Sequence, residues 1–211
     1  MATYPVFLEM KGRRCVVIGS GAVAQRRVEG LLASGAEVSV IGPAITAKLR
    51  DLSAERKIAH FKREYQKGDL VGFDLVFAAT DKPEINAAIF REASSRHIWV
   101  NSADDPDHCN FILPAVVRRG GLAVAVSSGG KSPAATRAIR QELEEYFTPD
   151  YARFVQIAGE ARHELRERSC FATGKAWSAA LKGDFRRLIS EGKTEEAKRV
   201  LIETLEASLC Q

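Results

Sequence analysis

The chain lacks any apolar run that approaches the roughly 20 residues needed to span a membrane. Its 211 residues include only four cysteines, Cys15, Cys109, Cys170 and Cys210, and none of them forms a C-x-x-C pair. This spacing argues against a structural zinc site and against a disulfide-stapled secreted fold. The first ten residues also lack the basic stretch and long apolar core of a signal peptide. We therefore expect a cytoplasmic protein with no membrane partner.

The chain also has no large excess of positive over negative residues. The formal net charge is +4, without the concentrated basic stripe expected of a nucleic-acid-binding surface, so a small anionic ligand is favoured over nucleic acid. The sequence contains no internal repeat and no low-complexity segment. A hydrophobic content of 45% with 27% charged residues is typical of a globular protein. The length suits one α/β domain with a smaller appendage.

A strand, a glycine turn, a helix and a second strand are expected within residues 15–41. Gly19 allows the tight turn after the first apolar run, and Gly21 has no side chain to keep the backbone away from a pyrophosphate. Ala24 is small enough for the helix to pack on the strand, and Gly35 ends the helix. The free N–H groups at the start of that helix favour bound phosphate. The pattern predicts a dinucleotide site, with an empty or mononucleotide-binding α/β unit as the alternative.

Strands and helices continue to alternate up to about residue 101. The expected helices cover 46–56 and 83–96, and the expected strands cover 58–65, 73–79 and 98–100. This alternation predicts a parallel sheet with helices on both faces, in which ligands bind beyond the carboxyl ends of the strands. Thr80, Asp81 and residues 101–105 should occupy that edge.

The pattern changes near residue 114. A strand is expected at 122–127, followed by a loop and a helix with Ser132 as N-cap and Pro133 at its first position. Beyond residue 149 the chain is expected to be helical in three segments, separated at Gly174 and near Gly192.

A series of short motifs then occurs in a fixed order along the chain. They are Tyr4–Leu8, Lys11–Arg13, the glycine turn through Arg27, Ala78–Asp81, Asn101 with Asp104, Phe111–Pro114 and Val126–Pro133. In this order they closely resemble the precorrin-2 dehydrogenase module of siroheme synthases, from about Pro5 to Glu145. The helical tail fits the family's third domain more loosely.

The resemblance implies NAD-dependent oxidation of precorrin-2 to sirohydrochlorin, on the way to siroheme or cobalamin. Some relatives then insert ferrous iron into sirohydrochlorin in the same cleft, and the sequence leaves open whether this chain does so. Fused relatives carry a methyltransferase module, for which 211 residues leave no room. Family members are homodimers, so we expect a homodimer here too.

The expected fold is α/β and has three parts. Residues 1–113 form a Rossmann-like parallel sheet that binds NAD. Residues 114–147 form a short strand–helix segment for dimerisation and substrate contact, and residues 148–211 form a small helical domain.

Asp104 is the expected catalytic residue. It matches the acid that the family places in its active cleft, and the carboxyl edge of a strand suits a proton acceptor. The alternative is that residues 104–107 are a solvated turn around Pro106. A metal cage of neighbouring side chains is not favoured, since adjacent positions seldom converge on one ion, and we expect no resident metal.

The remaining site residues fall into two sets. The expected cofactor contacts are Gly19, Ser20, Gly21, Ala22, Val23, Ile41, Pro43, Ala44, Thr80 and Asp81. The expected substrate contacts are Asn101, Ser127, Ser128, Gly129, Gly130, Lys131 and Ser132. For the serine-rich loop, a tight strand-to-helix turn is the alternative, but a substrate with many carboxylates favours an anion site.

The acid that often binds the ribose of NAD is missing, since residues 40–43 read Val-Ile-Gly-Pro. No arginine stands there for a 2′-phosphate either, so we expect NAD as the cofactor, with its ribose held by backbone. A regulatory domain that senses NAD without turnover is the competing function, because the fold alone does not separate the two.

Overall fold

The structure is a computed structural model that describes residues 3–103 and 105–208. Their contacts divide the chain into two compact units, Thr3–Ile112 and residues 113–208, each described here by itself. The predicted catalytic residue, Asp104, lies outside the described residues.

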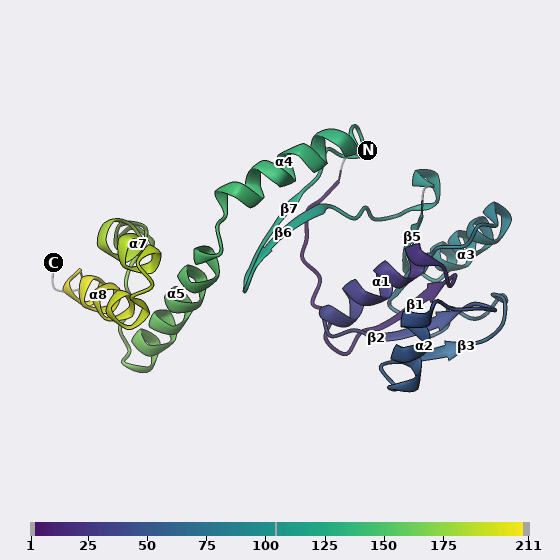
Figure 1. The fold of residues 1–211 in the computed structure, drawn as a ribbon, viewed down its shortest axis with the longest axis horizontal. Helices are drawn as coiled ribbons and strands as arrows, with labels where there is room; N and C mark the ends of the chain where they lie inside the picture. Colours follow the sequence, from purple (N-terminus) through teal and green to yellow (C-terminus); the bar gives the residue numbers. More distant parts are fainter. Residues whose placement is uncertain (1–2, 104, 209–211) are drawn as a thin grey trace. The chain divides into compact units, whose positions relative to one another are not determined.

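The first unit contains a five-stranded sheet with three helices (Figure 1). Its strands are β1 (Arg14–Ile18), β2 (Glu37–Ile41), β3 (Ile58–Phe61), β4 (Leu75–Ala78) and β5 (Trp99–Ser102), and its helices are α1 (Ala22–Ala33), α2 (Ala47–Ala54) and α3 (Pro83–Ser95). All neighbouring strands pair in parallel, in the order β3-β2-β1-β4-β5. The predicted Rossmann-like parallel sheet is confirmed. Several strand boundaries differ from the expected ones: β3 ends at Phe61, β4 is shorter at both ends, and β5 runs on to Ser102 and thus includes Asn101.

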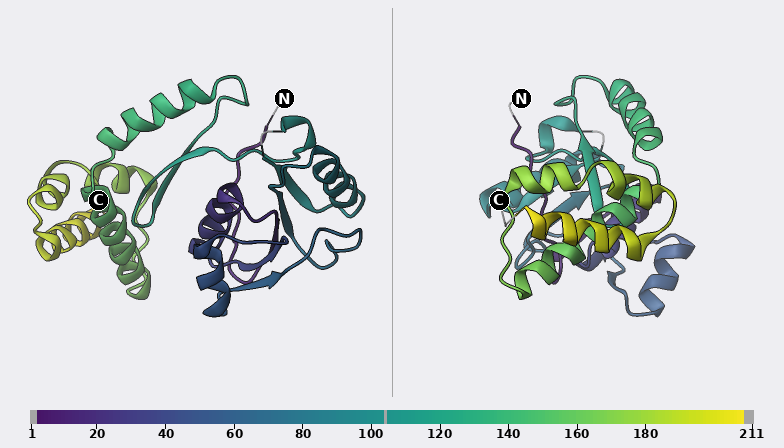
Figure 2. Two further views of the ribbon diagram at one scale, coloured as in Figure 1. Left: turned by 45° about the vertical axis from the view of Figure 1, so that its right-hand side comes forward. Right: turned by 90° about the vertical axis from the view of Figure 1, so that its left-hand side faces the viewer.

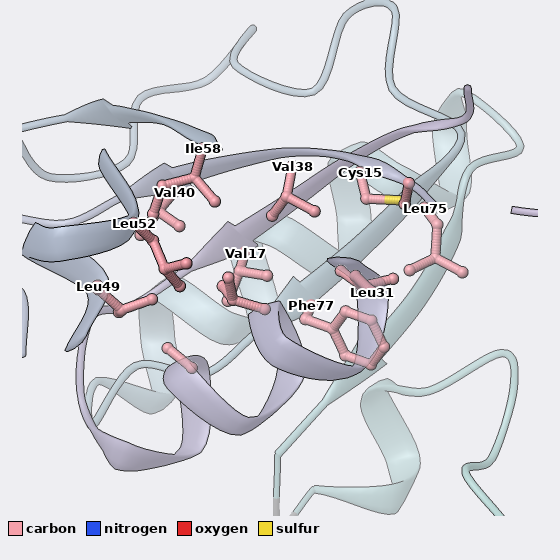
Figure 3. Close-up of a cluster of buried hydrophobic side chains, with 13 residues drawn as sticks. Cys15, Val17, Leu31, Val38, Val40, Leu49, Leu52, Ile58, Leu75 and Phe77 are labelled. Carbon is pink, nitrogen blue, oxygen red and sulfur yellow. The ribbon is translucent and has the colours of Figure 1, made fainter. Parts of the chain in front are cut away.

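Helices cover both faces of this sheet. Successive side chains of a strand point to opposite faces, so Cys15 and Val17 of β1 pack with α1 and α2 in one core, which Figure 3 shows. Val16 and Ile18 pack with α3 in a second core. Because both faces of β1 are buried from Cys15 to Ile18, this stretch is an unbroken apolar run instead of an alternating one.

The second unit begins with a hairpin and continues with helices. Its strands are β6 (Ala115–Arg119) and β7 (Leu122–Val126), and its helices are α4 (Pro133–Tyr146), α5 (Asp150–Glu167), α6 (Gly174–Ala180), α7 (Gly183–Ser190) and α8 (Thr194–Ala207). Figure 2 shows α5, α7 and α8 packed together, and their buried side chains form one core. The predicted N-cap is confirmed, since Ser132 Oγ accepts a hydrogen bond from Ala135 N at 3.2 Å.

Two expectations about this unit were wrong. The sequence analysis missed β6, which pairs antiparallel with β7 across the two-residue turn Gly120–Gly121. Gly120 has a φ of 55°, as the first central residue of a type II′ turn requires, and a Gly-Gly pair between two apolar runs was the available signal. The described part of the tail, up to residue 208, contains four helices instead of three, because the chain turns at Gly183, whose φ is 54°.

Among the described residues, no helix is both long enough and apolar enough to cross a membrane.

Candidate functional site

The order of the strands reverses between β1 and β4, which is where an open parallel sheet is expected to form a ligand-binding crevice. The chain leaves β1 toward β2 on one side, whereas β4 and β5 extend the sheet on the other. In open parallel sheets, ligands bind where the strand order reverses, beyond the carboxyl ends of the strands. Gly19 follows β1 and Ala79 follows β4 at this point, so the two strand exits frame the candidate site.

Gly19 is required by this arrangement for a structural reason. Its φ is 115°, a conformation that side chains rarely allow, and a Cβ atom there would lie 2.1 Å from the carbonyl oxygen of Ala79. The Gly19 N–H donates to the carbonyl oxygen of Ile41 at 2.9 Å. The glycine turn is therefore packed directly between the exits of β2 and β4.

Gly21 is a glycine for a different reason. Its φ of −84° suits any residue, and a Cβ atom there would meet no atom within 4 Å. It is the N-cap of α1, and no side chain caps this helix end. The first N–H groups of a helix have no partner within the helix, and anions bind there readily. The open space at Gly21 fits the close approach of a pyrophosphate.

Gly42, in the segment where a ribose-binding acid is often found, leaves no room for a side chain. A Cβ atom on Gly42 would lie 2.7 Å from Ser20 Oγ and 2.8 Å from Ser20 Cβ, so a side chain there would displace Ser20. The backbone of Gly42 is also used, since its N–H donates to Phe61 O and its carbonyl oxygen lies 2.9 Å from His60 Nε2. Pro43 and Ala44, two predicted cofactor contacts, are exposed beyond it.

The loop after β4 holds the other predicted cofactor contacts. Thr80 is half-buried and Asp81 is exposed. The Thr80 hydroxyl donates to Asn86 Oδ1 at 2.7 Å, and Asn86 Nδ2 donates to the carbonyl oxygen of Thr80 at 3.0 Å. Sequence reasoning missed Asn86, because nothing in its spacing distinguishes it from other asparagines.

At the end of β5, side chains form hydrogen bonds that join this strand to the segment containing residues 109–111. Asn101 is only 8% exposed, and its Nδ2 donates to the carbonyl oxygen of Phe111 at 3.0 Å. The thiol of Cys109 accepts from Ser102 N at 3.2 Å. Asn101 therefore has a structural role here, and its contact with substrate stays a prediction.

Beside the position of Asp104, Asp105 pairs with His108. His108 Nδ1 lies 2.6 Å from Asp105 Oδ2, and each side chain is about one-third exposed. The His108 ring also contacts Phe90 edge to face, with ring centroids 5.2 Å apart. A single 3₁₀ turn, Pro106–His108, connects them. The turn around Pro106, given above as the alternative for residues 104–107, is thus formed at the described residues from Asp105 onward.

The predicted substrate loop lies in the second unit, where it is bonded to itself. Ser128 Oγ accepts from Ser132 N at 3.0 Å and from Thr136 Oγ1 at 3.1 Å, and Ser127 Oγ accepts from Gly129 N at 3.1 Å. Gly129 and Gly130 both have positive φ angles. Lys131 is exposed. These contacts describe a tight turn, and an anion-binding role for it stays a prediction.

The cysteines of the described chain do not resemble a reactive or metal-binding set. Cys15, Cys109 and Cys170 are all unpaired. Burial raises the pKa of the Cys15 thiol to about 11 and also raises the pKa of Cys109, so both are neutral near pH 7. Among the described residues, no three His, Cys, Asp or Glu side chains are grouped so that they could hold a metal ion.

Two family models match the chain. The model described as "Putative NAD(P)-binding" matches residues 6–115, which is more than half of the chain. The model described as "Sirohaem biosynthesis protein central" matches residues 119–146.

Similar proteins include siroheme synthases. The chain is 36% identical to the siroheme synthase of Methylobacillus flagellatus over 209 residues, which cover 97% of this chain and 44% of that protein. It is also 36% identical to the siroheme synthase of Photobacterium profundum over 200 residues, which cover 94% of this chain and 43% of that one. The chain therefore spans less than half the length of these relatives.

The fold is also similar to a solved structure described as SirC, precorrin-2 dehydrogenase. The TM-score is 0.74 at 24% sequence identity, and the alignment covers 97% of this chain and 100% of that one.

Proposed function

Because this chain belongs to the putative NAD(P)-binding family, we propose that it is a dehydrogenase that oxidises precorrin-2 to sirohydrochlorin with NAD as the acceptor. The observation that carries the proposal is the glycine turn at the crevice between β1 and β4, with Gly19 packed against Ala79 and open space at Gly21. The names of the relatives and of the similar structure support the choice of substrate.

The residues present fit a nicotinamide dinucleotide. The turn at Gly19–Gly21 and the uncapped start of α1 would hold the pyrophosphate, and the exposed backbone at Pro43 and Ala44 would face the adenosine ribose. When bound, the nicotinamide ring supplies the hydride acceptor. The protein's own part is to bind and orient the cofactor and to accept a proton.

We propose NAD over NADP as the cofactor. Arg63, which follows β3, does not offer a free guanidinium for a 2′-phosphate, since Nη1 and Nη2 bind the Asp69 carboxylate at 2.7 and 2.8 Å. We expect a higher kcat/KM with NAD than with NADP when precorrin-2 is the substrate. An equal or higher kcat/KM with NADP would contradict this choice.

We propose Asp104 as the proton acceptor. Loss of a general base typically lowers turnover by roughly 100- to 10,000-fold, and we expect Asp104→Asn to do so with little change in NAD affinity. Asp105→Asn is the control, because an asparagine oxygen can still accept the hydrogen bond that joins Asp105 to His108. Normal NAD reduction by Asp104→Asn would remove this residue from the dehydrogenation.

One assay tests the function as a whole. The purified chain is given precorrin-2 with and without NAD and ferrous iron, and the absorption spectrum is followed. NAD-dependent conversion to sirohydrochlorin is the expected result. NAD binding without turnover would instead favour the regulatory domain, and a further spectral change with iron would add iron insertion, which the proposal leaves open.

The assembly and location expected from the sequence are kept as proposals. These are a homodimer formed through residues 114–147, the three-part division into residues 1–113, 114–147 and 148–211, and a cytoplasmic location. The two family models support the division, since one ends at residue 115 and the other covers residues 119–146.

A further inference from the structure

Asn86 of α3 is a buried polar residue that the proposed chemistry does not use. It is 6% exposed. Burying an amide is unfavourable unless its donors and acceptors are bonded. Both of the bonds that Asn86 makes through its side chain go to one residue, Thr80. This arrangement suggests that Asn86 serves the Thr80 loop.

The chemistry of Thr80 determines how the Asn86 amide is oriented. A carbonyl oxygen can only accept, so the Asn86 nitrogen must face the Thr80 carbonyl, at 3.0 Å. The Asn86 oxygen then faces the Thr80 hydroxyl, at 2.7 Å, and takes its proton. The Lys82 carbonyl oxygen, at 3.2 Å, is a longer alternative acceptor for this proton, and the hydroxyl oxygen itself accepts from Lys82 N at 3.3 Å. Asn86 thus fixes the Thr80 backbone and makes its hydroxyl an acceptor toward any further partner.

Thr80 stands directly beside the glycine turn. A Cβ atom on Gly19 would lie 2.1 Å from Ala79 O and 3.1 Å from Thr80 N. Any displacement of the Thr80 loop therefore changes the wall of the crevice between β1 and β4.

We propose that Asn86 is a positioning residue for the dinucleotide. It holds the Thr80 hydroxyl so that a remaining lone pair accepts a hydrogen bond from a donor group of the cofactor, which is a ribose hydroxyl or the nicotinamide carboxamide. The inference rests on the proposed function, because it requires that a dinucleotide binds at this crevice.

A double-mutant cycle tests the inference through cofactor affinity. The dissociation constant of NAD is measured by calorimetry on the full chain and on Asn86→Ala, Thr80→Val and the double variant. Loss of a buried hydrogen bond should weaken NAD binding by about tenfold in each single variant. The double variant should bind NAD only slightly more weakly than either single variant, since both changes remove the same interaction.

Asn110→Ala is the matched control. The Asn110 side chain also makes two hydrogen bonds to backbone. Its Nδ2 donates to Ile98 O at 3.1 Å, and its Oδ1 accepts from Val100 N at 2.7 Å, so these bonds hold the beginning of β5 and the residue before it. Its loss should lower the Tm of the cofactor-free chain and leave the NAD affinity unchanged. An equal loss of affinity in Asn110→Ala and Asn86→Ala would overturn the positioning role.

The remaining outcomes separate the two proposals. If the unaltered chain binds no NAD, the proposed function fails; if it binds NAD and Asn86→Ala binds it equally well, only the present inference fails. If Asn86→Ala does not fold, Thr80→Ser and Thr80→Val decide, since only the serine keeps the hydroxyl and should keep the affinity. ADP-ribose, which lacks the carboxamide, distinguishes the two donor groups: its affinity falls in Asn86→Ala only if the donor is a ribose hydroxyl.

Discussion

Gly19 and Gly21 are neighbours in one motif, but they are subject to different constraints. At Gly19 the protein itself leaves no room, because of a φ of 115° and the nearby carbonyl of Ala79. At Gly21 the protein leaves the space open. A substitution at Gly19 should therefore affect folding, whereas a substitution at Gly21 should affect the ligand.

Gly21→Val tests this difference. The variant should keep its circular dichroism spectrum and lose most of its affinity for NAD, because the new side chain occupies the path of the pyrophosphate. Gly30→Val is the control, since Gly30 lies on the same helix and a Cβ atom there also meets no atom within 4 Å. Unchanged NAD affinity in Gly21→Val would mean that the dinucleotide binds elsewhere.

At the scale of elements, α3 is fastened to the loop before β4 by one buried carboxylate. The Glu92 side chain is 4% exposed, accepts from Tyr65 Oη at 2.5 Å and from Gly68 N at 2.9 Å, and pairs with Arg96 Nε at 3.0 Å. Burial alone would raise the pKa of Glu92, but these hydrogen bonds outweigh burial and lower it. Burial raises the pKa of Tyr65, and the hydrogen bond to Glu92 raises it further.

This lowered pKa predicts a pH-dependent contribution to stability. A carboxyl whose pKa is lower in the folded state stabilises the protein above its unfolded pKa of about 4.3, and that stabilisation is lost as the pH falls through the folded pKa. Glu92→Gln should therefore lower the free energy of unfolding at pH 7 by about 1–3 kcal/mol relative to the unaltered chain. Below pH 4 the two free energies of unfolding should differ by less. Urea denaturation at pH 7 and below pH 4 measures both.

Glu55→Gln is the control for that measurement. Glu55 also has a lowered pKa, through its hydrogen bond with Lys57, but the pair is exposed, and exposed ion pairs contribute little to stability. Equal stability of Glu92→Gln and the unaltered chain at pH 7 would show that Glu92 does not fasten α3.

At the scale of the whole molecule, α4 is a helix without a buried face of its own. None of its residues, all of which the structure describes, is buried, and Ile139 and Tyr146 are 44% and 66% exposed. Its carboxyl end is bonded to the hairpin, where Arg119 donates to Phe147 O at 2.6 Å and to Glu144 O at 2.9 Å. A second copy of the chain would cover the apolar side chains of this segment.

We therefore expect light scattering to show a dimer at micromolar concentration. Ile139→Glu should weaken that dimer by placing a charge in the covered face, while Lys175→Glu on the exposed surface of α6 should leave it intact. A monomer for the unaltered chain at micromolar concentration would contradict the homodimer.

Much of the first unit could be predicted because its signals are local. The apolar run of β1, the glycine turn and the helix that follows are adjacent in sequence, and the second strand expected within residues 15–41 is β2, which ends at Ile41. The hairpin is only partly predictable because β6 ends in two charged residues, Arg118 and Arg119, which cut its apolar run short. Arg119 binds backbone carbonyls at the end of α4.

The sequence by itself determined the order of strands and helices, the parallel sheet and the glycine turn, because these depend on periodicity and backbone freedom over a few residues. The tertiary structure alone decided which distant groups meet. It placed Gly19 against Ala79, Gly42 against Ser20 and Glu92 in hydrogen-bond contact with Tyr65. Such contacts depend on how separate strands and loops pack, and a single sequence holds no short-range pattern that specifies them.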